Sequence, residues 1–335
     1  MEVSVVIPTC NRKTRLLALL DNLNQSTIPI EEVIIVDSGE DMITTEECSA
    51  FTNLKIESIS SQKSVCIQRN LGIQKARSAW ILLCDDDIEV PPDYLEKLVT
   101  HIADYCETGA ISGLWLQKEN EEWKATYPEK SAKRLLWKYV FNLSIWGEIR
   151  CKSNNFIVKR IKNYYRQKGN HISRSGFPVL TDFSGEFFTT PLYSLGASLV
   201  KKEWLLVSPF DETLDRHGIG ENYGVISKFP VPLVEVLNNI FVLHHREPAN
   251  RLQQSLQYYR RVLALDYFIS GKNISANVKR RSLLWALFGN MLSFMFSGNG
   301  DMLRATLKSF RQIAFGKNPY WRGAREGKKV IEPDL

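Results

Sequence analysis

Three consecutive carboxylates, Asp85, Asp86 and Asp87, follow a short apolar run in this 335-residue chain. Negative charges this close together repel one another unless a cation neutralises them. Carboxylate oxygens suit Mg²⁺ or Mn²⁺, and these ions often complete their coordination with substrate phosphates. If the strand continues through the three residues, Asp85 and Asp87 point the same way and can share one ion. The competing interpretation is a solvated acidic turn before the helix that starts near Pro91.

Polar side chains also follow two other apolar runs, each typical of a buried parallel strand. Thr9 and Arg12 come after residues 3–7, and Asp37 comes after residues 33–36. Helical patterns separate these runs, so we expect parallel strands with right-handed crossovers. Ligands of such sheets bind beyond the carboxyl ends of the strands. Three strands therefore bring polar groups to one sheet edge, which predicts a binding site there.

The remaining pattern completes an α/β chain with a helical end. We expect helices at 11–23, 68–79 and 93–101, strands at 54–59, 80–83 and 110–116, and a strand pair at 231–245. Residues 117–180 are rich in aromatic and basic side chains and poor in acidic ones. From residue 251 the pattern is helical. The tail from residue 316 is polar, which predicts a loose end.

The formal net charge of +6 favours partners that carry phosphate, or an anionic membrane surface, and leaves nucleic acid open. The six cysteines lack CxxC and metal-site spacings, which indicates reduced thiols in a cytoplasmic protein. We find no signal-peptide pattern and no apolar stretch of the roughly 20 residues that span a bilayer. Residues 283–296 follow a basic cluster. They are predicted either as a buried helix or as a helix on the inner membrane surface.

Four blocks resemble glycosyltransferase family 2 in letters, order and spacing. They are VVIPTCNR at 5–12, IIVDSG at 34–39, RNLGI at 69–73 and LCDDD at 83–87. The later segments GAS at 196–198, PFDE at 209–212 and GIGEN at 218–222 look like the family's acceptor side. The resemblance implies the GT-A fold, a Rossmann-like, mixed, mainly parallel sheet flanked by helices. It divides the chain into a glycosyltransferase domain at 1–245, with a nucleotide-sugar half at 1–116 and an acceptor half at 117–245, and a C-terminal helical region at 246–335 whose membrane association is left open.

The resemblance also implies roles for single residues. For the donor, Pro8, Thr9 and Arg12 line the nucleotide pocket, and Asp37 binds the base. Arg69 lies near the diphosphate or the aspartates, and Asn70 lies near the sugar. Asp85 and Asp87 bracket the ribose, the diphosphate and the metal, and Asp86 also belongs to the donor-binding residues. For the metal, Mn²⁺ or Mg²⁺, the ligands are Asp85, Asp87 and His244, with His245 as the alternative.

An inverting transfer needs a carboxylate that takes the proton of the acceptor hydroxyl. Many family members place Glu-Asp at the start of a late helix, whereas this chain has Glu221-Asn222. An amide cannot act as a general base, so Glu221 is the predicted base. Asp215 and Asp211 are the alternatives. A carboxylate that only stabilises the helix start is the competing interpretation for Glu221.

The predicted function is a metal-dependent, inverting glycosyltransferase of bacterial surface polysaccharide synthesis. Its donor is a nucleotide sugar, and Asp37 favours a UDP- or dTDP-sugar. Its acceptor is a glycan or a lipid-linked molecule. Residues 117–180 are predicted to select that acceptor. A nucleotidyltransferase, a non-catalytic family member and a nucleic-acid-binding protein are the alternatives. The last leaves the aspartates unexplained, because they repel phosphate without a metal.

Overall fold

The structure, a computed structural model, describes residues 1–105, 107–245, 252–271 and 277–335. Its strands are β1 (Val3–Thr9), β2 (Glu32–Asp37), β3 (Ile56–Ser60), β4 (Trp80–Cys84), β5 (Ile88–Glu89), β6 (Ala110–Glu119), β7 (Glu122–Lys124), β8 (Ile145–Trp146), β9 (His171–Ile172), β10 (Pro178–Leu180), β11 (Phe187–Thr190), β12 (Ala197–Lys201) and β13 (Val234–His244). Its helices are α1 (Lys13–Asn24), α2 (Thr45–Ser49), α3 (Val65–Lys75), α4 (Tyr94–Asp104), α5 (Ala132–Phe141), α6 (Phe156–Lys168), α7 (Lys202–Val207), α8 (Glu221–Ile226), α9 (Gln254–Ser270), α10 (Arg280–Phe296), α11 (Gly300–Ala314) and α12 (Pro319–Arg325).

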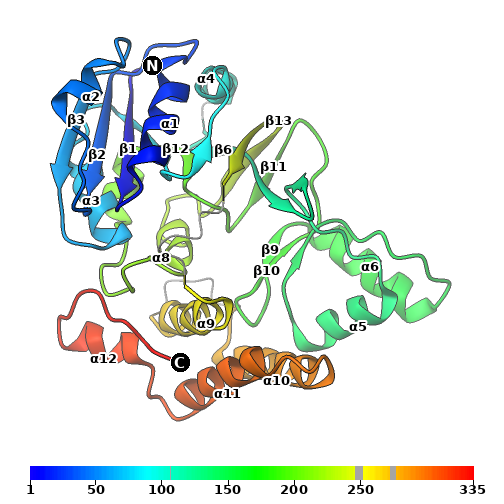
Figure 1. The fold of residues 1–335 in the computed structure, drawn as a ribbon. Helices are drawn as coiled ribbons and strands as arrows, with labels where there is room; N and C mark the ends of the chain where they lie inside the picture. Colours follow the sequence, from blue (N-terminus) through cyan, green and yellow to red (C-terminus); the bar gives the residue numbers. More distant parts are fainter. Residues whose placement is uncertain (106, 246–251, 272–276) are drawn as a thin grey trace.

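The main sheet has the order β11-β13-β6-β12-β4-β1-β2-β3, with β5 paired to β13 and β7 paired to β6 (Figure 1). Strands β3, β2, β1 and β4 are parallel, and β13 is parallel to β6. Strand β12 is antiparallel to both β4 and β6, so β6 and β4 run in the same direction. The predicted mixed, mainly parallel sheet is confirmed. As a result β1, β4 and β13 all end at the same sheet edge.

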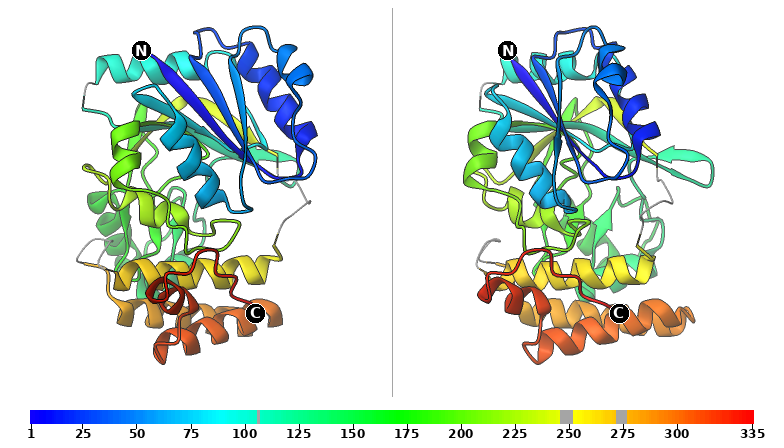
Figure 2. Two further views of the ribbon diagram at one scale, coloured as in Figure 1. Left: turned by 90° about the vertical axis from the view of Figure 1, so that its left-hand side faces the viewer. Right: turned by 60° about the vertical axis from the view of Figure 1, so that its left-hand side comes forward.

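Helices cover both faces of the sheet, which explains why its strands read as continuous apolar runs (Figure 2). Val5 and Ile7 of β1 belong to a core cluster that also contains Leu16 and Leu20 of α1. Val6, between them, belongs to the cluster on the other face, which includes α3. Successive side chains of a strand point to opposite faces, so every position of β1 is buried.

Two local predictions need correction. The strand pair expected at 231–245 is one strand, β13, whose pairing with β6 is irregular between Leu237 and Phe241. The amide of Asn238 in this bulge donates to the backbone oxygens of Phe183 and Gly185, so the interruption is held in place and the strand continues without a turn. The helix expected at 68–79 is α3, which starts at Val65 and ends at Lys75 because Ala76 adopts an extended backbone.

The aromatic and basic segment at 117–180 forms a small substructure with its own core. Helices α5 and α6 pack with a separate three-stranded sheet of order β8-β10-β9. Its buried residues are Leu135, Ile145, Cys151, Val158, Ile161, Tyr165 and Val179. The segment therefore stands beside the main sheet as a compact unit, as Figure 1 shows.

The C-terminal helices pack beneath the sheet and share its core (Figure 2). The expected start at Arg251 lies outside the described residues, and α9 begins at Gln254. Helix α10 covers the apolar segment at 283–296, burying Leu283 and Leu287 while leaving Phe296 76% exposed. Among the described residues, no helix is both long and apolar enough to cross a bilayer.

The predicted loose tail from residue 316 is wrong. It contains α12, and the residues beyond α12 return to the loop before α8, where Val330 and Ile331 donate backbone hydrogen bonds to Glu212 and Thr213. The guanidinium of Arg260 on α9 donates to the backbone oxygen of Pro333 and forms an ion pair with Glu332 at 2.6 Å. A polar tail is ordered here because a buried cation binds it.

Arg260→Leu is expected to lower the free energy of unfolding by about 3–5 kcal/mol, measured by urea denaturation. Arg260 also pairs with the completely buried Asp215 at 3.4 Å, and the substitution would leave that carboxylate without its cation. The matched control is Arg261→Leu, because the next residue of the same helix is exposed and should change stability by less than about 0.5 kcal/mol. Equal stabilities of the two variants would contradict this role of Arg260.

The structure also bears on the cysteines. Cys48, Cys66, Cys84 and Cys151 are free thiols, and Cys106 lies outside the described residues. Burial raises the pKa of the Cys66 thiol well above its usual value. Cys66 is therefore neutral at physiological pH.

Candidate functional site

A cleft of about 280 Å³ opens at the edge where β1, β4 and β13 end. The predicted site residues that line it are Pro8, Thr9, Arg12, Arg69, Asp85, Asp86, Asp87, Glu221 and His244. They come from the ends of three strands, from α3 and from the start of α8. These residues converge because the three strands run in the same direction, so their carboxyl ends lie at one edge of the sheet.

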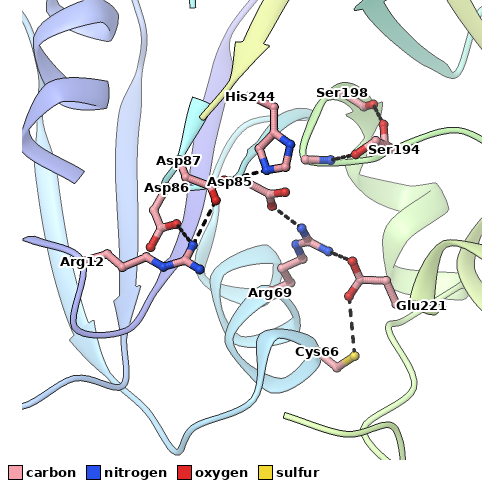
Figure 3. A network of polar contacts seen from close by, with 11 residues as sticks. Arg12, Cys66, Arg69, Asp85, Asp86, Asp87, Ser194, Ser198, Glu221 and His244 are labelled. Carbon is pink, nitrogen blue, oxygen red and sulfur yellow. Dashed lines mark hydrogen bonds and ion pairs between the residues drawn. The ribbon is translucent and has the colours of Figure 1, made fainter. Parts of the chain in front are cut away.

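The three aspartates divide between two arginines (Figure 3). Arg12 contacts Asp86 at 2.9 Å and Asp87 at 3.2 Å, and the hydroxyl of Thr9 donates to Asp86 at 2.7 Å. Asp85 instead faces Arg69, at 2.5 Å. The strand does not continue through the aspartates, because β4 ends at Cys84, so strand alternation gives no reason for Asp85 and Asp87 to point the same way. That the two share one ion stays a prediction.

Arg69 connects the aspartates to the start of α8. Its guanidinium bridges Asp85 and Glu221, and only 4% of its side chain is exposed. Its Nε is buried without a hydrogen-bond partner among the described residues. A buried guanidinium retains a large share of its charge interactions because little water screens them. This bridge couples the carboxylate at the strand end to the carboxylate of the late helix.

Burial dominates the electrostatics of the carboxylates. It raises the pKa of Glu221 to about 7, with Arg69 opposing the shift and Asp85 adding to it. It also raises the pKa of Asp86 to about 6, with Arg12 opposing the shift and Asp87 adding to it. A buried carboxylate disfavours its charged form, and one arginine shared by two acids compensates only in part. Glu221 therefore exchanges its proton near physiological pH.

The structure distinguishes the two neighbouring histidines. His244 Nε2 lies 3.3 Å from a carboxylate oxygen of Asp87, and its ring contacts Trp115, with centroids 4.8 Å apart. His245 faces away and contacts Glu89 at 3.0 Å. Antiparallel pairing of β13 with β5 places His244 opposite Ile88, directly after Asp87. The Nδ1 atom of His244 is buried without a partner among the described residues.

The donor chemistry of the cleft fits a hard divalent cation. Asp85 and Asp87 supply carboxylate oxygens and His244 supplies an imidazole nitrogen, a set suited to Mn²⁺ or Mg²⁺. Within the described residues, however, no three such side chains converge as a ready metal-binding group. Arg12 and Arg69 supply cations that neutralise the aspartates, and metal binding stays a prediction.

Besides His245, four predicted residues do not line the cleft: Asp37, Asn70, Asp211 and Asp215. Asp37 ends β2, and its carboxylate accepts the amide of Gly39; burial raises its pKa. Asn70, predicted beside the sugar, binds the backbone of Phe210.

The two alternative bases are both engaged in packing contacts. Asp215 accepts the hydroxyl of Tyr320 at 3.0 Å, and Asp211 accepts that of Tyr267 at 2.9 Å. Asp215 is also completely buried. These partners come from the C-terminal helices, which sequence patterns could not place. As positioned, neither carboxylate faces the cleft, whereas Glu221 does.

Several side chains of the cleft were not predictable from the sequence patterns. Gln68 donates from one amide to the backbone oxygens of Thr9 and Val36, both at 2.7 Å, and so joins the ends of β1 and β2. Lys63 and Arg216 add positive charge to the lining. They lie in loops with no periodic pattern, and the only available signal was that Gln68 directly precedes the RNLGI block.

Gly196→Ala is expected to reduce activity in the cleft strongly without unfolding the chain. A β-carbon at this position would lie 2.2 Å from Asp85 Oδ2, so the carboxylate would have to leave Arg69. Any catalysed turnover should fall by about 10²-fold or more, measured as kcat/KM. Gly300→Ala is the matched control, because its added β-carbon meets no atom within 4 Å. Normal turnover by Gly196→Ala would contradict the importance of the contact between Asp85 and Arg69.

Comparisons with known proteins agree with this geometry. The sequence model of glycosyl transferase family 2 matches residues 4–174. YwdF of Bacillus subtilis, named an uncharacterized glycosyltransferase, is 30% identical over 113 residues, which are 33% of this chain and 42% of that protein. This chain spans only 42%, 33% and 18% of three curated relatives.

Two solved structures share the fold at low sequence identity. TarS of S. aureus in complex with UDP-GlcNAc has a TM-score of 0.54 and 12% identity, over 98% of this chain and 93% of that chain. The mannosyltransferase PcManGT of Pyrobaculum calidifontis, in complex with GDP-Man and Mn²⁺, has a TM-score of 0.50 and 15% identity, over 97% and 86%. The fold prediction is thus confirmed. From the cleft at the strand ends and a family match over half of its length, we conclude that this chain belongs to glycosyl transferase family 2.

Proposed function

We propose that the chain is a metal-dependent, inverting glycosyltransferase that moves a sugar from a nucleotide-sugar donor to a glycan or lipid-linked acceptor. The observation that carries this proposal is the buried bridge Asp85–Arg69–Glu221. It joins carboxylates from the strand-end motif and from the late helix in one cleft. Family membership supports a transferase over a nucleic-acid-binding protein. The proposal keeps 1–116 as the nucleotide-sugar half, 117–245 as the acceptor half and 246–335 as a helical region.

Glu221 supplies the base of the proposed reaction. Its pKa of about 7 lets it hold or release a proton at physiological pH, which is what general-base catalysis requires. It takes the proton of the acceptor hydroxyl while the oxygen attacks the anomeric carbon from the side opposite the leaving diphosphate. This single displacement inverts the anomeric centre. Arg69 holds the carboxylate of Glu221 in position and favours its deprotonated form.

The positive charges of the cleft serve the donor. Arg12, Lys63 and Arg216 line it and bind negative oxygens of a diphosphate. Asp85, Asp87 and His244 would hold the divalent ion. When bound, that ion stabilises the negative charge that develops on the leaving nucleotide. Arg12 and Arg69 hold the aspartates in position for both the diphosphate and the divalent ion.

The structural neighbours support the donor class without fixing it. The TarS structure contains UDP-GlcNAc, and that of PcManGT contains GDP-Man and Mn²⁺. We favour UDP- or dTDP-sugars because the family resemblance assigns Asp37 to the base and a carboxylate can accept the N–H of uracil or thymine. Asp37 ends β2 outside the lining of the cleft, so the base would have to extend beyond that lining to reach it. The proposed setting is bacterial surface polysaccharide synthesis in the cytoplasm, with peripheral contact to the inner membrane face. The exposed Trp285 and Phe296 of α10 support that contact.

A thermal-shift screen tests this function with UDP, dTDP, GDP and ADP and their sugars, each with Mn²⁺ and with EDTA. A ligand that binds only the folded chain raises the melting temperature by mass action. We expect UDP or dTDP compounds to raise it by several degrees with Mn²⁺ and not with EDTA. A shift without nucleotide-sugar hydrolysis or transfer would favour a non-catalytic family member. Turnover of a nucleoside triphosphate with a sugar 1-phosphate would favour a nucleotidyltransferase.

A further inference from the structure

A second cavity, of about 570 Å³, lies on the other side of the start of α8. Gly220 and Asn222 line this cavity, whereas Glu221 between them lines the cleft. The remaining walls come from α5, from the segments around β8 and residue 194, and from α9 and α10. The same short segment thus faces two spaces, and Glu221, the proposed base, lines the cleft.

Two buried polar atoms of residues that line this cavity have no hydrogen-bond partner among the residues that the structure describes. They are the indole Nε1 of Trp137 on α5 and the side-chain oxygen Oδ1 of Asn222 on α8. One is a donor and the other an acceptor, and both residues line the cavity. Leaving such an atom unsatisfied costs free energy, which a bound molecule with hydroxyl groups would recover. A hydroxyl group can serve both, since it donates and accepts.

Flat aromatic surfaces form part of the wall. The rings of Trp146 and Tyr193 are stacked, with centroids 6.0 Å apart and planes 18° apart. Hydrogen bonds fix both: Trp146 donates to the backbone oxygen of Ala125, and the Tyr193 hydroxyl accepts the amide of Trp115. Fixed ring faces beside polar groups suit a saccharide, whose C–H faces are apolar and whose edges carry hydroxyls.

The charge of this cavity is positive. Arg134, Lys138 and Arg261 line it, and no acidic side chain is among its described lining residues. Arg134 and Lys138 are neutralised by Glu129, at 3.3 and 2.9 Å. The guanidinium of Arg261 on α9 has neither an ion pair nor a hydrogen bond in the described part of the chain. An unpaired guanidinium is a strong ligand for a carboxylate or phosphate.

We propose that this second cavity is the acceptor subsite and that it takes a saccharide bearing an anionic group, which Arg261 selects. Asn222 and Trp137 bind the hydroxyl groups of that saccharide. The inference rests on the proposed transferase function. It gives Asn222 a task that an amide can perform: Asn222 holds the acceptor in the cavity so that the reacting hydroxyl extends past the start of α8 to Glu221 in the cleft. The anionic group is either a uronic acid carboxylate or a sugar phosphate.

Binding to the full chain tests this subsite with three probes that differ only at C6: methyl β-glucoside, methyl β-glucuronide and methyl β-glucoside 6-phosphate. Ligand-observed NMR at physiological salt gives the Kd values. We expect at least one acidic probe to bind about tenfold more tightly than the neutral one. Preference for the glucuronide assigns a uronic acid acceptor, and preference for the phosphate assigns a sugar phosphate. Arg261→Gln should bring the acidic and neutral probes to within about twofold of each other.

Two further variants separate the groups of the subsite. Trp137→Phe keeps a ring but removes the N–H, and should weaken all three probes by about threefold to tenfold. Arg304→Gln, an exposed arginine on α11, is the charge control and should keep the acidic preference. Equal binding of acidic and neutral probes, no binding of any probe, or a preference that survives Arg261→Gln would overturn the proposal. Nucleotide binding, measured by thermal shift on the same variants, reports the transferase function separately, because its residues line the other cleft.

Discussion

Glu221→Gln is expected to lower kcat by about 10²–10⁴-fold while the donor Kd changes by less than about twofold. Glutamine matches the shape of glutamate and still meets Arg69 through its oxygen, but it cannot accept the hydroxyl proton. Glu221 is the carboxylate that lines the cleft from α8, whereas Asp215 and Asp211 are engaged by Tyr320 and Tyr267. Single-turnover rates and thermal shifts with the donor nucleotide would measure the two effects.

Asp211→Asn is the matched control for this variant, since it removes a carboxylate of the neighbouring loop that does not line the cleft. It should retain most of the turnover. Near-normal turnover in Glu221→Gln, together with loss in the control, would move the base to the loop. Equal loss of donor binding and turnover in Glu221→Gln would assign Glu221 a structural role instead.

The pH dependence of turnover follows from the same residue. Burial raises the pKa of Glu221 to about 7, and the base works only when it is deprotonated. Activity is therefore fully present above about pH 8 and is lost as the pH falls through 7, at about tenfold in kcat/KM per pH unit below that value. Glu221→Gln should remove this dependence from its residual activity. A wild-type profile that stays flat from pH 5 to 8 would contradict the assignment.

Asp87→Asn is expected to abolish the Mn²⁺-dependent thermal shift with the donor nucleotide and to lower kcat/KM by at least about 10²-fold. One carboxylate oxygen of Asp87 faces His244 and the other faces Arg12. The amide preserves the shape but removes the charge that attracts both a divalent ion and Arg12. The fold should persist, as checked by circular dichroism, because Asp86 still pairs with Arg12.

Asp41→Asn provides the control for Asp87→Asn. Asp41 pairs with Lys13 on the surface, with 76% of its side chain exposed, and should change neither binding nor turnover measurably. An active Asp87→Asn enzyme whose nucleotide binding still disappears with EDTA would move the metal to other ligands. If EDTA does not weaken donor binding to the wild type, the arginines alone neutralise the negative charges in the cleft.

The sequence alone determined the α/β class and the edge at which the site forms. Buried strands must be apolar on both faces when helices cover both, so the runs at 3–7, 33–36 and 80–83 were readable without tertiary information. Chain direction in a parallel sheet then placed Thr9 and the three aspartates at one edge. The order and spacing of the four sequence blocks indicated glycosyltransferase family 2, and the match over residues 4–174 confirms that family.

Tertiary structure decided which charges meet. Asp85 faces Arg69 while Asp86 and Asp87 face Arg12, because a turn after β4 reorients side chains that strand periodicity would have alternated. His244 rather than His245 faces Asp87 only because a two-residue strand, β5, pairs with β13.

The C-terminal helices decided the rest. Asp215 and the polar tail are held by Arg260, more than forty residues from Asp215 along the chain, and the second cavity joins walls from α5, α8, α9 and α10. Periodicity reports the local balance between apolar burial and solvent. It carries no information on long-range ion pairs or on cavities, because these depend on which distant segments the packed core brings together.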